Sequence, residues 1–412
     1  MRYSAGFPVA LTCGLANNKR RVYVEAAILP FHPAFDEATL LDLQERLAKA
    51  RWPEPETVED WSQGMPLGYT RELAHHWQHD YDYSRVASTL SRWPNFLTTI
   101  DDIDIHFIYQ RSPHSQATPL LLTHGWPGSV LEFRHMIERL TEPTRFGGQV
   151  EDAFHVVVPS LPGYGFSGKP AAPGTGVQKI AQLWEALMQR LGFDRFLAHG
   201  GDWGSMVTQA IALQQTTACA SIHITLPVVS PDPATMDELT PEEVQALEAF
   251  NFYQEWDSGY SKQQSTRPQT LGYGLADSPV GQMAWIIEKY AQWCDCVRDG
   301  VRHPENAVTR DELLDTVMMY WCTNSAASSA KLYWESFNQP DLSEITLPLA
   351  ISLFPTEIFR TSKRWAQQRF TNLIYFNADI QSGGHFAALE APQTLTEELW
   401  PWKQRLRDSA IL

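Results

Sequence analysis

The chain has 412 residues, of which 43% are hydrophobic and 12% aromatic, so it can bury a large core and is unlike a disordered chain. Its formal net charge of −16 opposes nonspecific binding to nucleic acid or anionic membrane. The five cysteines form no C-x-x-C pair, and no run approaches about 20 apolar residues, so we expect reduced thiols, no membrane span and a soluble, cytoplasmic protein.

The first hundred residues read as polar and mainly helical. A helix is predicted to begin after Asp36, a common capping residue, and to end at residues 52–53 (WP). Apolar residues three or four positions apart define its buried face: Leu40, Leu43, Leu47 and Ala50.

From about residue 101, short apolar runs alternate with helical stretches. Strands are predicted at residues 119–123, 154–158, 195–198 and 222–226, and a helix at residues 177–191. Strands that are apolar throughout and separated by helices indicate a parallel sheet covered on both faces.

The alternation stops after residue 227 and returns near the end of the chain. Residues 228–345 read as helical, strands follow at 347–353 and 372–376, and a helix covers 394–408. A helical block inserted into such a sheet is typical of a cap over the carboxyl ends of the strands, where these sheets bind ligands. We therefore expect four parts: a largely helical N-terminal arm (1–100), an α/β core (101–227 and 346–412) and a helical cap (228–345).

A candidate nucleophile lies in the sequence GGDWG at residues 200–204, after a predicted strand and before a helix. The pattern matches the G-x-S-x-G elbow of the α/β-hydrolase fold, in which a sharp turn presents the nucleophile, with Asp202 in the serine position. Asp202 could instead be an ordinary helix cap. The elbow interpretation predicts an acid and then a histidine farther along the chain.

Both companion residues are present in that order. Glu357 follows the predicted strand at 347–353, and His385, in GGHF, follows the strand at 372–376. Each alone could be a surface carboxylate or a loop histidine. Their order and placement favour a triad of Asp202, Glu357 and His385 on an α/β-hydrolase fold.

An aspartate nucleophile changes the chemistry of such a triad. A carboxylate that attacks a saturated carbon forms an ester with the enzyme, which water must then hydrolyse. His385 would activate that water, Glu357 would orient the imidazole, and the backbone N–H groups of Trp126 and Trp203 would stabilise the tetrahedral intermediate.

The leaving group distinguishes two substrate classes. A haloalkane releases halide without a proton, whereas an epoxide releases an alkoxide that needs an acid, which a tyrosine can supply. Sequence spacing does not choose among the tyrosines of the helical block, most of which could simply be packed aromatic residues: Tyr253, Tyr260, Tyr273, Tyr290, Tyr320 and Tyr333.

These residues resemble the microsomal and juvenile-hormone epoxide hydrolase family, from about residue 28 to the C-terminus. The section from ILPF at 28–31 to RWP at 51–53 is similar to that family's N-terminal arm. Four further motifs match: HGWPGS (124–129), PSLPGYGFS (159–167), GGDWG (200–204) and DSPVG (277–281).

The resemblance implies roles for five residues and a small-molecule epoxide as substrate. Asp202 would be the nucleophile, Glu357 the charge-relay acid and His385 the base, with Tyr260 and Tyr333 as proton donors. Many animal members have an N-terminal membrane anchor, which residues 1–27 do not supply. The resemblance thus favours a soluble form like those of microbes, with an apolar substrate and no stable membrane anchor; a homodimer is compatible with it.

Several other functions are weighed against this interpretation. The match to G-x-G-x-x-G at residues 163–168 is followed by prolines, not a helix, which argues against a dinucleotide site, and no metal-ligand spacing occurs, so no cofactor or metal is expected. A haloalkane dehalogenase and an enzyme that opens the epoxide of one dedicated metabolite remain alternatives. A binding protein on an inactive fold predicts a broken set of site residues, and none is broken.

Overall fold

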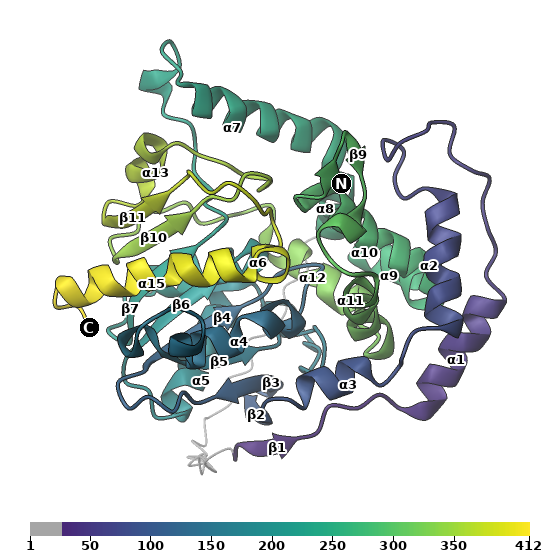
Figure 1. The fold of residues 1–412 in the computed structure, drawn as a ribbon, viewed down its shortest axis with the longest axis horizontal. Coiled ribbons are helices and arrows are strands. Elements are labelled where there is room, and N and C mark those ends of the chain that lie inside the picture. Colours follow the sequence, from purple (N-terminus) through teal and green to yellow (C-terminus); the bar gives the residue numbers. More distant parts are fainter. Residues whose placement is uncertain (1–26) are drawn as a thin grey trace, which may run out of the picture.

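One mixed sheet forms the centre of the molecule (Figure 1). In the computed structural model of the chain, which describes residues 27–412, nine strands have the order β1-β2-β3-β5-β4-β6-β7-β10-β11. The strands are β1 (Leu29–Phe31), β2 (Asn95–Ile100), β3 (Ile103–Gln110), β4 (Thr118–Thr123), β5 (Phe154–Pro159), β6 (Phe196–Gly200), β7 (Cys219–Ile224), β10 (Leu349–Ser352) and β11 (Leu373–Asn377). Strands β5, β4, β6, β7, β10 and β11 are parallel neighbours, so their carboxyl ends share one edge.

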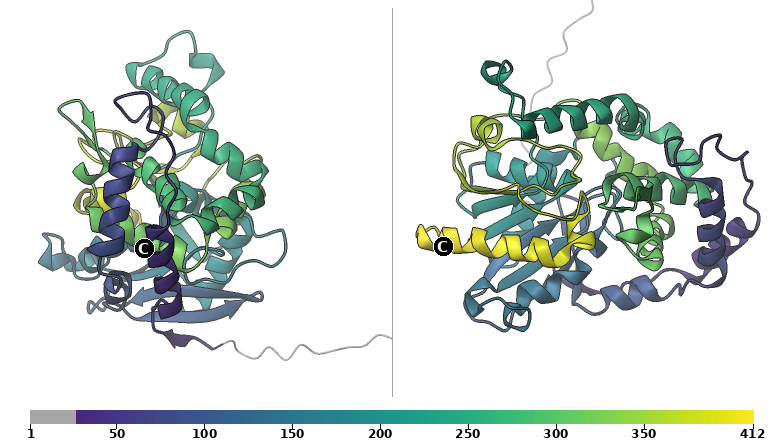
Figure 2. Two further views of the ribbon diagram at one scale, coloured as in Figure 1. Left: turned by 90° about the vertical axis from the view of Figure 1, so that its right-hand side faces the viewer. Right: turned by 45° about the horizontal axis from the view of Figure 1, so that its top comes forward.

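Helices cover both faces of this sheet, as the apolar strands require (Figures 1 and 2). Helix α15 packs against β7, β10, β11 and α4 on one face, and α5 packs with α6 on the other. Their bounds are α4 (Ile137–Thr141), α5 (Val177–Arg190), α6 (Asp202–Leu213) and α15 (Pro392–Asp408). The structure therefore has the predicted α/β-hydrolase fold.

A helical insertion separates β7 from β10 and lies beside the carboxyl edge of the sheet (Figure 2, right). Its α-helices are α7 (Pro241–Phe252), α8 (Gly259–Thr266), α9 (Pro268–Asp277), α10 (Pro279–Trp293), α11 (Arg310–Cys322) and α12 (Ala326–Ser336). A short π-helix, η5 (Tyr253–Asp257), joins α7 to α8, and a two-stranded hairpin of β8 (Val297–Arg298) and β9 (Val301–Arg302) lies between α10 and α11. We call residues 233–336 the insertion.

The N-terminal arm, described from residue 27 to residue 100, is less helical than its sequence suggests. Helices α1 (Glu37–Ala48), α2 (Leu67–His79) and α3 (Arg85–Leu90) are present, but β1 and β2 also belong to it. Strands β2 and β3 form a hairpin whose turn residues, Asp101 and Asp102, have φ of 49° and 63°. Aspartate adopts this left-handed region less readily than glycine. The turn also has no Asn-Gly pair, the usual sequence signal of a tight hairpin. Asp36 precedes α1 as predicted, but its side chain makes no capping hydrogen bond.

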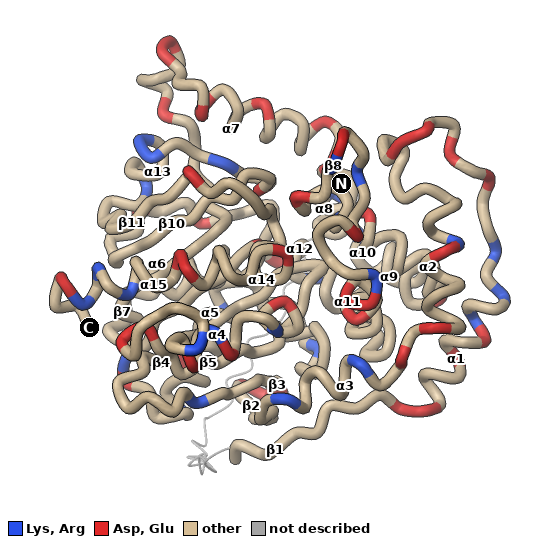
Figure 3. The backbone as a smooth tube through the Cα atoms, viewed as in Figure 1, with Lys and Arg blue, Asp and Glu red and all other residues tan. Residues whose placement is uncertain are grey.

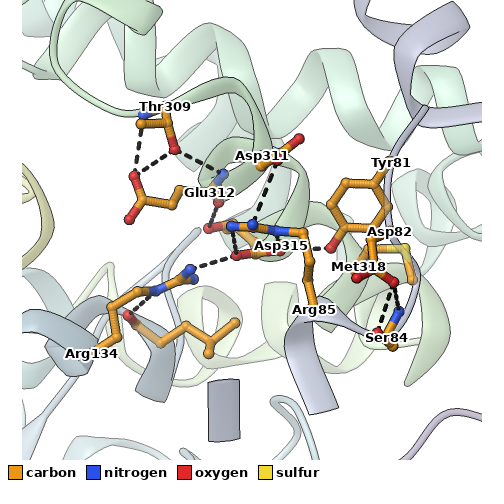
Figure 4. Close-up of polar contacts among 12 residues, drawn as sticks. Tyr81, Asp82, Ser84, Arg85, Arg134, Thr309, Asp311, Glu312, Asp315 and Met318 are labelled. Carbon is orange, nitrogen blue, oxygen red and sulfur yellow. Dashed lines mark hydrogen bonds and ion pairs between the residues drawn. The ribbon is translucent and has the colours of Figure 1, made fainter. Parts of the chain in front are cut away.

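A buried charge cluster fastens this arm to the rest of the molecule (Figure 4). Asp315 of α11, with a fully buried side chain, accepts hydrogen bonds from Tyr81 Oη (2.6 Å) and from the guanidinium groups of Arg85 and Arg134. Tyr81 and Arg85 belong to the arm, and Arg134 lies in the 3₁₀ helix η1 (Val130–His135). One carboxylate therefore joins the arm, the insertion and the segment after β4.

Replacing Asp315 with alanine is expected to destabilise the protein by about 3–5 kcal/mol, because Arg134 would stay buried without its counter-charge. Asp311→Ala is the matched control: Asp311 lies on the same helix, but its side chain is 38% exposed and its ion pairs should contribute about 1 kcal/mol or less. Urea unfolding measures both values. Equal midpoint shifts for the two variants would contradict the role given to Asp315.

The distribution of charged residues and the state of the cysteines can be compared with the expectations from composition. Acidic and basic side chains are interspersed, with acidic residues along α1 and α7 (Figure 3). Among residues 27–412, no helix is long and apolar enough to span a membrane. Cys219, Cys294, Cys296 and Cys322 are free thiols. Cys13, and the expectation that residues 1–27 supply no anchor, fall on the part of the chain that the structure does not describe, apart from Ala27.

Candidate active site

Asp202 lies on a tight turn between β6 and α6. Its backbone has φ of 48°, a left-handed conformation that a non-glycine residue adopts only when its surroundings impose it. The glycines nearby allow the close approach: a Cβ on Gly204 would lie 1.8 Å from the carbonyl oxygen of Thr123, and a Cβ on Gly125 would lie 2.2 Å from Asp202 Oδ1. The turn therefore has the strained elbow geometry that the GGDWG sequence predicts.

The Asp202 carboxylate has its two oxygens in different environments. Oδ1 accepts a hydrogen bond of 2.7 Å from the backbone N–H of Trp126, which follows β4. Oδ2 lies 3.1 Å from His385 Nε2. Within the described residues, the N–H of Trp203 makes no hydrogen bond to this carboxylate, so Trp126 is the only one of the two predicted oxyanion donors in contact with it.

His385 and Glu357 complete a continuous hydrogen-bonded set. His385 Nδ1 lies 2.6 Å from Glu357 Oε1, and both residues are buried. The backbone N–H of Ile358 also donates to Glu357 Oε1 (2.8 Å), which fixes that carboxylate. All three predicted residues come from loops at the carboxyl ends of parallel strands, which explains why they meet although they are far apart in sequence.

The charge of this set favours a protonated imidazole. Burial lowers the pKa of His385, but the charge of Glu357, the hydrogen bonds to Asp202 and Glu357 and the charge of Asp202 outweigh it and raise the pKa well above the usual value. With Asp202 ionised, His385 is therefore an imidazolium between two carboxyl groups. It can act as a base only after one of these charges has been removed.

The end of helix α10 supports the histidine from the insertion. The backbone N–H of His385 donates to the carbonyl oxygen of Trp293, the last residue of α10, at 3.0 Å. The indole ring of Trp293 also packs against the imidazole, with ring centroids 4.9 Å apart. A Cβ on the preceding residue, Gly384, would lie 2.4 Å from the same carbonyl oxygen, so this contact requires glycine there.

A cavity of about 260 Å³ opens above Asp202, between the sheet and the insertion. Its walls are mostly apolar, and three tyrosines line it: Tyr253, Tyr260 and Tyr333. Tyr333 Oη has no hydrogen-bond partner among the described residues, and Tyr260 Oη lies 3.4 Å from Tyr253 Oη. Asp202 and all three tyrosines therefore line one cavity.

The two tyrosines that the resemblance singled out lie against both tryptophans of the site. The ring of Tyr260 stacks on Trp126 at 5.0 Å, and that of Tyr333 packs edge-on against Trp203 at 4.8 Å. Burial, with smaller effects from Tyr333 and Asp202 among others, raises the pKa of Tyr260 well above its usual value. Burial and the charge of Asp202 do the same for Tyr333. Both hydroxyls therefore keep their protons and can donate hydrogen bonds.

The other candidate tyrosines lie elsewhere. Tyr273 is 70% exposed on α9, and Tyr290 stacks on Phe386 at 4.0 Å. Tyr320 donates its hydroxyl hydrogen to the carbonyl oxygen of Gly128 (2.7 Å). Three-dimensional packing thus reduces the six candidates to three, a distinction that sequence spacing does not contain.

Two polar residues near Asp202 are not among the site residues predicted from the sequence. Glu132 of η1 and His199 of β6 line a second, smaller cavity that also touches Asp202 and His385. Each is a polar side chain within an apolar run, VLEF for Glu132 and FLAHG for His199. A titratable residue in such a run is the sequence signal that could have identified them. Among the described residues, no cluster of side chains suits a metal ion.

Two known families match parts of the chain. The family described as "Epoxide hydrolase N terminus" matches residues 28–133, and the family described as "alpha/beta hydrolase fold" matches residues 118–296. A putative epoxide hydrolase of Stigmatella aurantiaca is 49% identical over 381 residues, covering 92% of this chain and 86% of its own. Epoxide hydrolase 1 of Sus scrofa is 32% identical over 403 residues, covering 91% and 88%.

Solved structures of epoxide hydrolases also superpose on this chain. The juvenile hormone epoxide hydrolase of the silkworm Bombyx mori superposes with a TM-score of 0.86 at 28% identity, over 93% of this chain and 96% of its own. The Aspergillus niger epoxide hydrolase superposes with a TM-score of 0.82 at 30% identity, over 92% and 96%. With its motifs, fold and relatives in agreement, the chain belongs to the epoxide hydrolase family of the α/β-hydrolase fold.

Proposed function

We propose that this enzyme converts a small apolar epoxide to a vicinal diol through an ester on Asp202. The observation that supports this most strongly is the meeting, in one apolar cavity, of the Asp202 carboxylate with the hydroxyls of Tyr260 and Tyr333. A nucleophile and two proton donors on opposite sides of a ligand are what epoxide opening needs.

In the first step, Asp202 Oδ2 attacks a ring carbon, because Oδ1 is already held by the Trp126 N–H. The carbon–oxygen bond of the epoxide breaks, and its oxygen takes a proton from Tyr260 or Tyr333. The product of this step is a hydroxyalkyl ester of Asp202 and a tyrosinate.

The ester is uncharged, so it removes one of the groups that raise the pKa of His385. His385 can then pass its proton to the tyrosinate and become a base. This order explains how an imidazole that rests as a cation serves in the second step.

In the second step, water attacks the carbonyl carbon of the ester and gives a proton to His385 Nε2, while Glu357 stabilises the imidazolium. Negative charge develops on Oδ1, where the Trp126 N–H lies and where we assign the Trp203 N–H as second donor. The bond from Cγ to Oδ2 breaks, the departing alkoxide takes a proton from His385, and the new carboxyl group returns one. The insertion acts as the cap that excludes bulk water from these steps.

The test compares epoxides with haloalkanes. We expect the purified enzyme to convert styrene oxide and bulkier aryl or alkyl epoxides to diols, measured by chromatography, and to release no halide from bromoalkanes of similar size. Halide release without diol formation would favour a haloalkane dehalogenase instead. Two tyrosine hydroxyls facing the nucleophile have no use in that reaction, because halide leaves without a proton.

Replacing Tyr260 and Tyr333 together with phenylalanine is expected to lower kcat/KM for epoxides by about 10²–10⁴-fold, the usual contribution of a general acid. Each single substitution should lower kcat/KM by less than the double substitution, since the other hydroxyl remains. Tyr273→Phe is the matched control, because Tyr273 is 70% exposed on the same insertion. The rate of ester formation in single-turnover experiments measures the effect, and an unchanged rate in the double variant would remove these tyrosines from the mechanism.

A further inference from the structure

A second cavity, with a different set of lining residues from the substrate cavity, also touches Asp202. It measures about 20 Å³, and Asp202 is the only residue that lines both cavities. A space of about 10–15 Å³ suffices for one water molecule when polar partners are present. Its polar lining residues are Glu132, His199, Asp202, Thr225 and His385, and its other walls are apolar or glycine.

A buried hydrogen-bonded chain leads from this cavity through the sheet. His199 of β6 and His223 of β7 are paired in register, with their Nδ1 atoms 2.9 Å apart. His223 Nε2 lies 3.0 Å from Ser352 Oγ, and Ser352 Oγ lies 2.6 Å from Glu398 Oε2. Tyr375 and Asn377 also donate to the Glu398 carboxylate, which closes the chain at its far end.

The direction of these bonds sets the tautomer of each histidine. A carboxylate only accepts, so Ser352 donates its proton to Glu398 and accepts from His223 Nε2–H. Burial lowers the pKa of His199 to about 4 and that of His223 well below its usual value, so each ring is neutral and has one N–H. With the proton of His223 on Nε2, its Nδ1 must accept from His199 Nδ1–H. His199 Nε2 is then an unprotonated acceptor on the side of the cavity.

Glu132 offers the complementary group. Its side chain lines the cavity beside Asp202 and His385. Burial, with the charge of Asp202, raises the pKa of Glu132 to about 8, so the carboxyl group is largely protonated at neutral pH and can donate. The cavity therefore presents a donor, a fixed acceptor and the catalytic imidazole to one water molecule.

We propose that this cavity is the binding site of the hydrolytic water, held by Glu132 and His199; the proposal rests on the ester mechanism given above. The water accepts a hydrogen bond from the Glu132 carboxyl and donates one hydrogen to His199 Nε2 and the other to neutral His385 Nε2. Its remaining lone pair is free to form the bond to Cγ of the Asp202 ester. The proton on His385 is the one that leaves in this step, and His199 keeps its role as acceptor without taking a proton.

The site also separates the two reactants. The alkyl group of the ester occupies the substrate cavity, and the water occupies the second cavity, which shares only Asp202 with the first among its lining residues. A bulky substrate therefore does not displace the water that releases it. Glu398, on α15, orients the water through three intervening side chains and is a positioning residue, not a catalytic one.

Glu132→Leu and His199→Phe test the proposal in single-turnover experiments with styrene oxide, in which quenched samples are analysed by intact-protein mass spectrometry. We expect the ester on Asp202 to form at the wild-type rate and to be hydrolysed about 10- to 100-fold more slowly, as for loss of a buried hydrogen bond. Glu132→Gln is the matched control, since its amide still donates to the water. It should hydrolyse the ester within about threefold of wild type.

The outcomes separate this proposal from the mechanism on which it rests. Wild-type hydrolysis rates in both Glu132→Leu and His199→Phe would overturn the water site and leave the ester mechanism intact. Equal slowing of ester formation and hydrolysis would also overturn it, because a merely structural role affects both steps. Absence of any ester on Asp202 in wild type and in His385→Gln, despite diol formation, would overturn the ester mechanism itself.

Discussion

Asp202→Ala is expected to abolish diol formation, with a loss of about 10⁴-fold or more in kcat, because no other group in the cavity can form the ester. The turn keeps the positive φ at residue 202 in the variant, and circular dichroism checks that the variant folds. Asp277→Ala is the matched control, an identical change at a side chain that is 83% exposed. Diol formation by the Asp202 variant at a rate near that of wild type would exclude the proposed mechanism.

Isotope labelling tests the same mechanism by following the oxygen atom of water. In one turnover in ¹⁸O-labelled water, the label should enter the Asp202 carboxylate and not the diol, since the diol takes its new oxygen from Oδ2. Direct attack of water on the epoxide would place the label in the diol. Mass spectrometry of the peptide that contains Asp202 distinguishes the two paths.

His385→Gln is expected to accumulate the ester rather than to prevent its formation. The variant loses the base of the second step, so ester hydrolysis should slow by about 10²–10⁴-fold, while Asp202 remains able to attack. Incubation with substrate should therefore raise the mass of the protein by that of one substrate molecule. His75→Gln, at an exposed position on α2, should turn over normally.

The pH dependence of wild-type ester hydrolysis supplies a second measurement of the same step. A base must be neutral to act, so the rate should rise with pH through the pKa of His385 in the ester form and then become constant. Because the ester lacks the Asp202 charge, this pKa should be lower than that of His385 in the free enzyme. A rate that falls as pH rises through this range would contradict the role of His385 as base.

The order of local signals in the sequence was enough to predict the parallel strands of the sheet and to place Asp202, Glu357 and His385 at one edge of it. Strands β4, β5, β6, β7, β10 and β11 are continuous apolar runs, and Asp202, Glu357 and His385 each follow one of them. Because parallel strands end at one edge, chain order alone brings these residues together. Turn glycines beside Asp202 and His385 add a local signal, since the backbone needs them for close contacts.

Features that depend on packing between distant segments could not be predicted in this way. The β2–β3 hairpin lacks a glycine at its turn, so β2 looks like part of the helical arm. The choice of cavity tyrosines depends on how the insertion helices rotate against the sheet, and no local pattern encodes that rotation. Glu132 and His199 meet in a cavity formed by five separate segments of the chain.

The contact between Trp293 and His385 limits how this enzyme can be engineered. The carbonyl oxygen of Trp293, at the end of α10, accepts a hydrogen bond from the backbone N–H of His385, the proposed base, and only glycine fits at the preceding position. A chimera that exchanges the whole insertion for that of a relative would thus change the contact that positions His385 as well as the substrate cavity. Exchanges that replace α7 to α9 but retain α10 should alter substrate range while preserving the hydrolytic step.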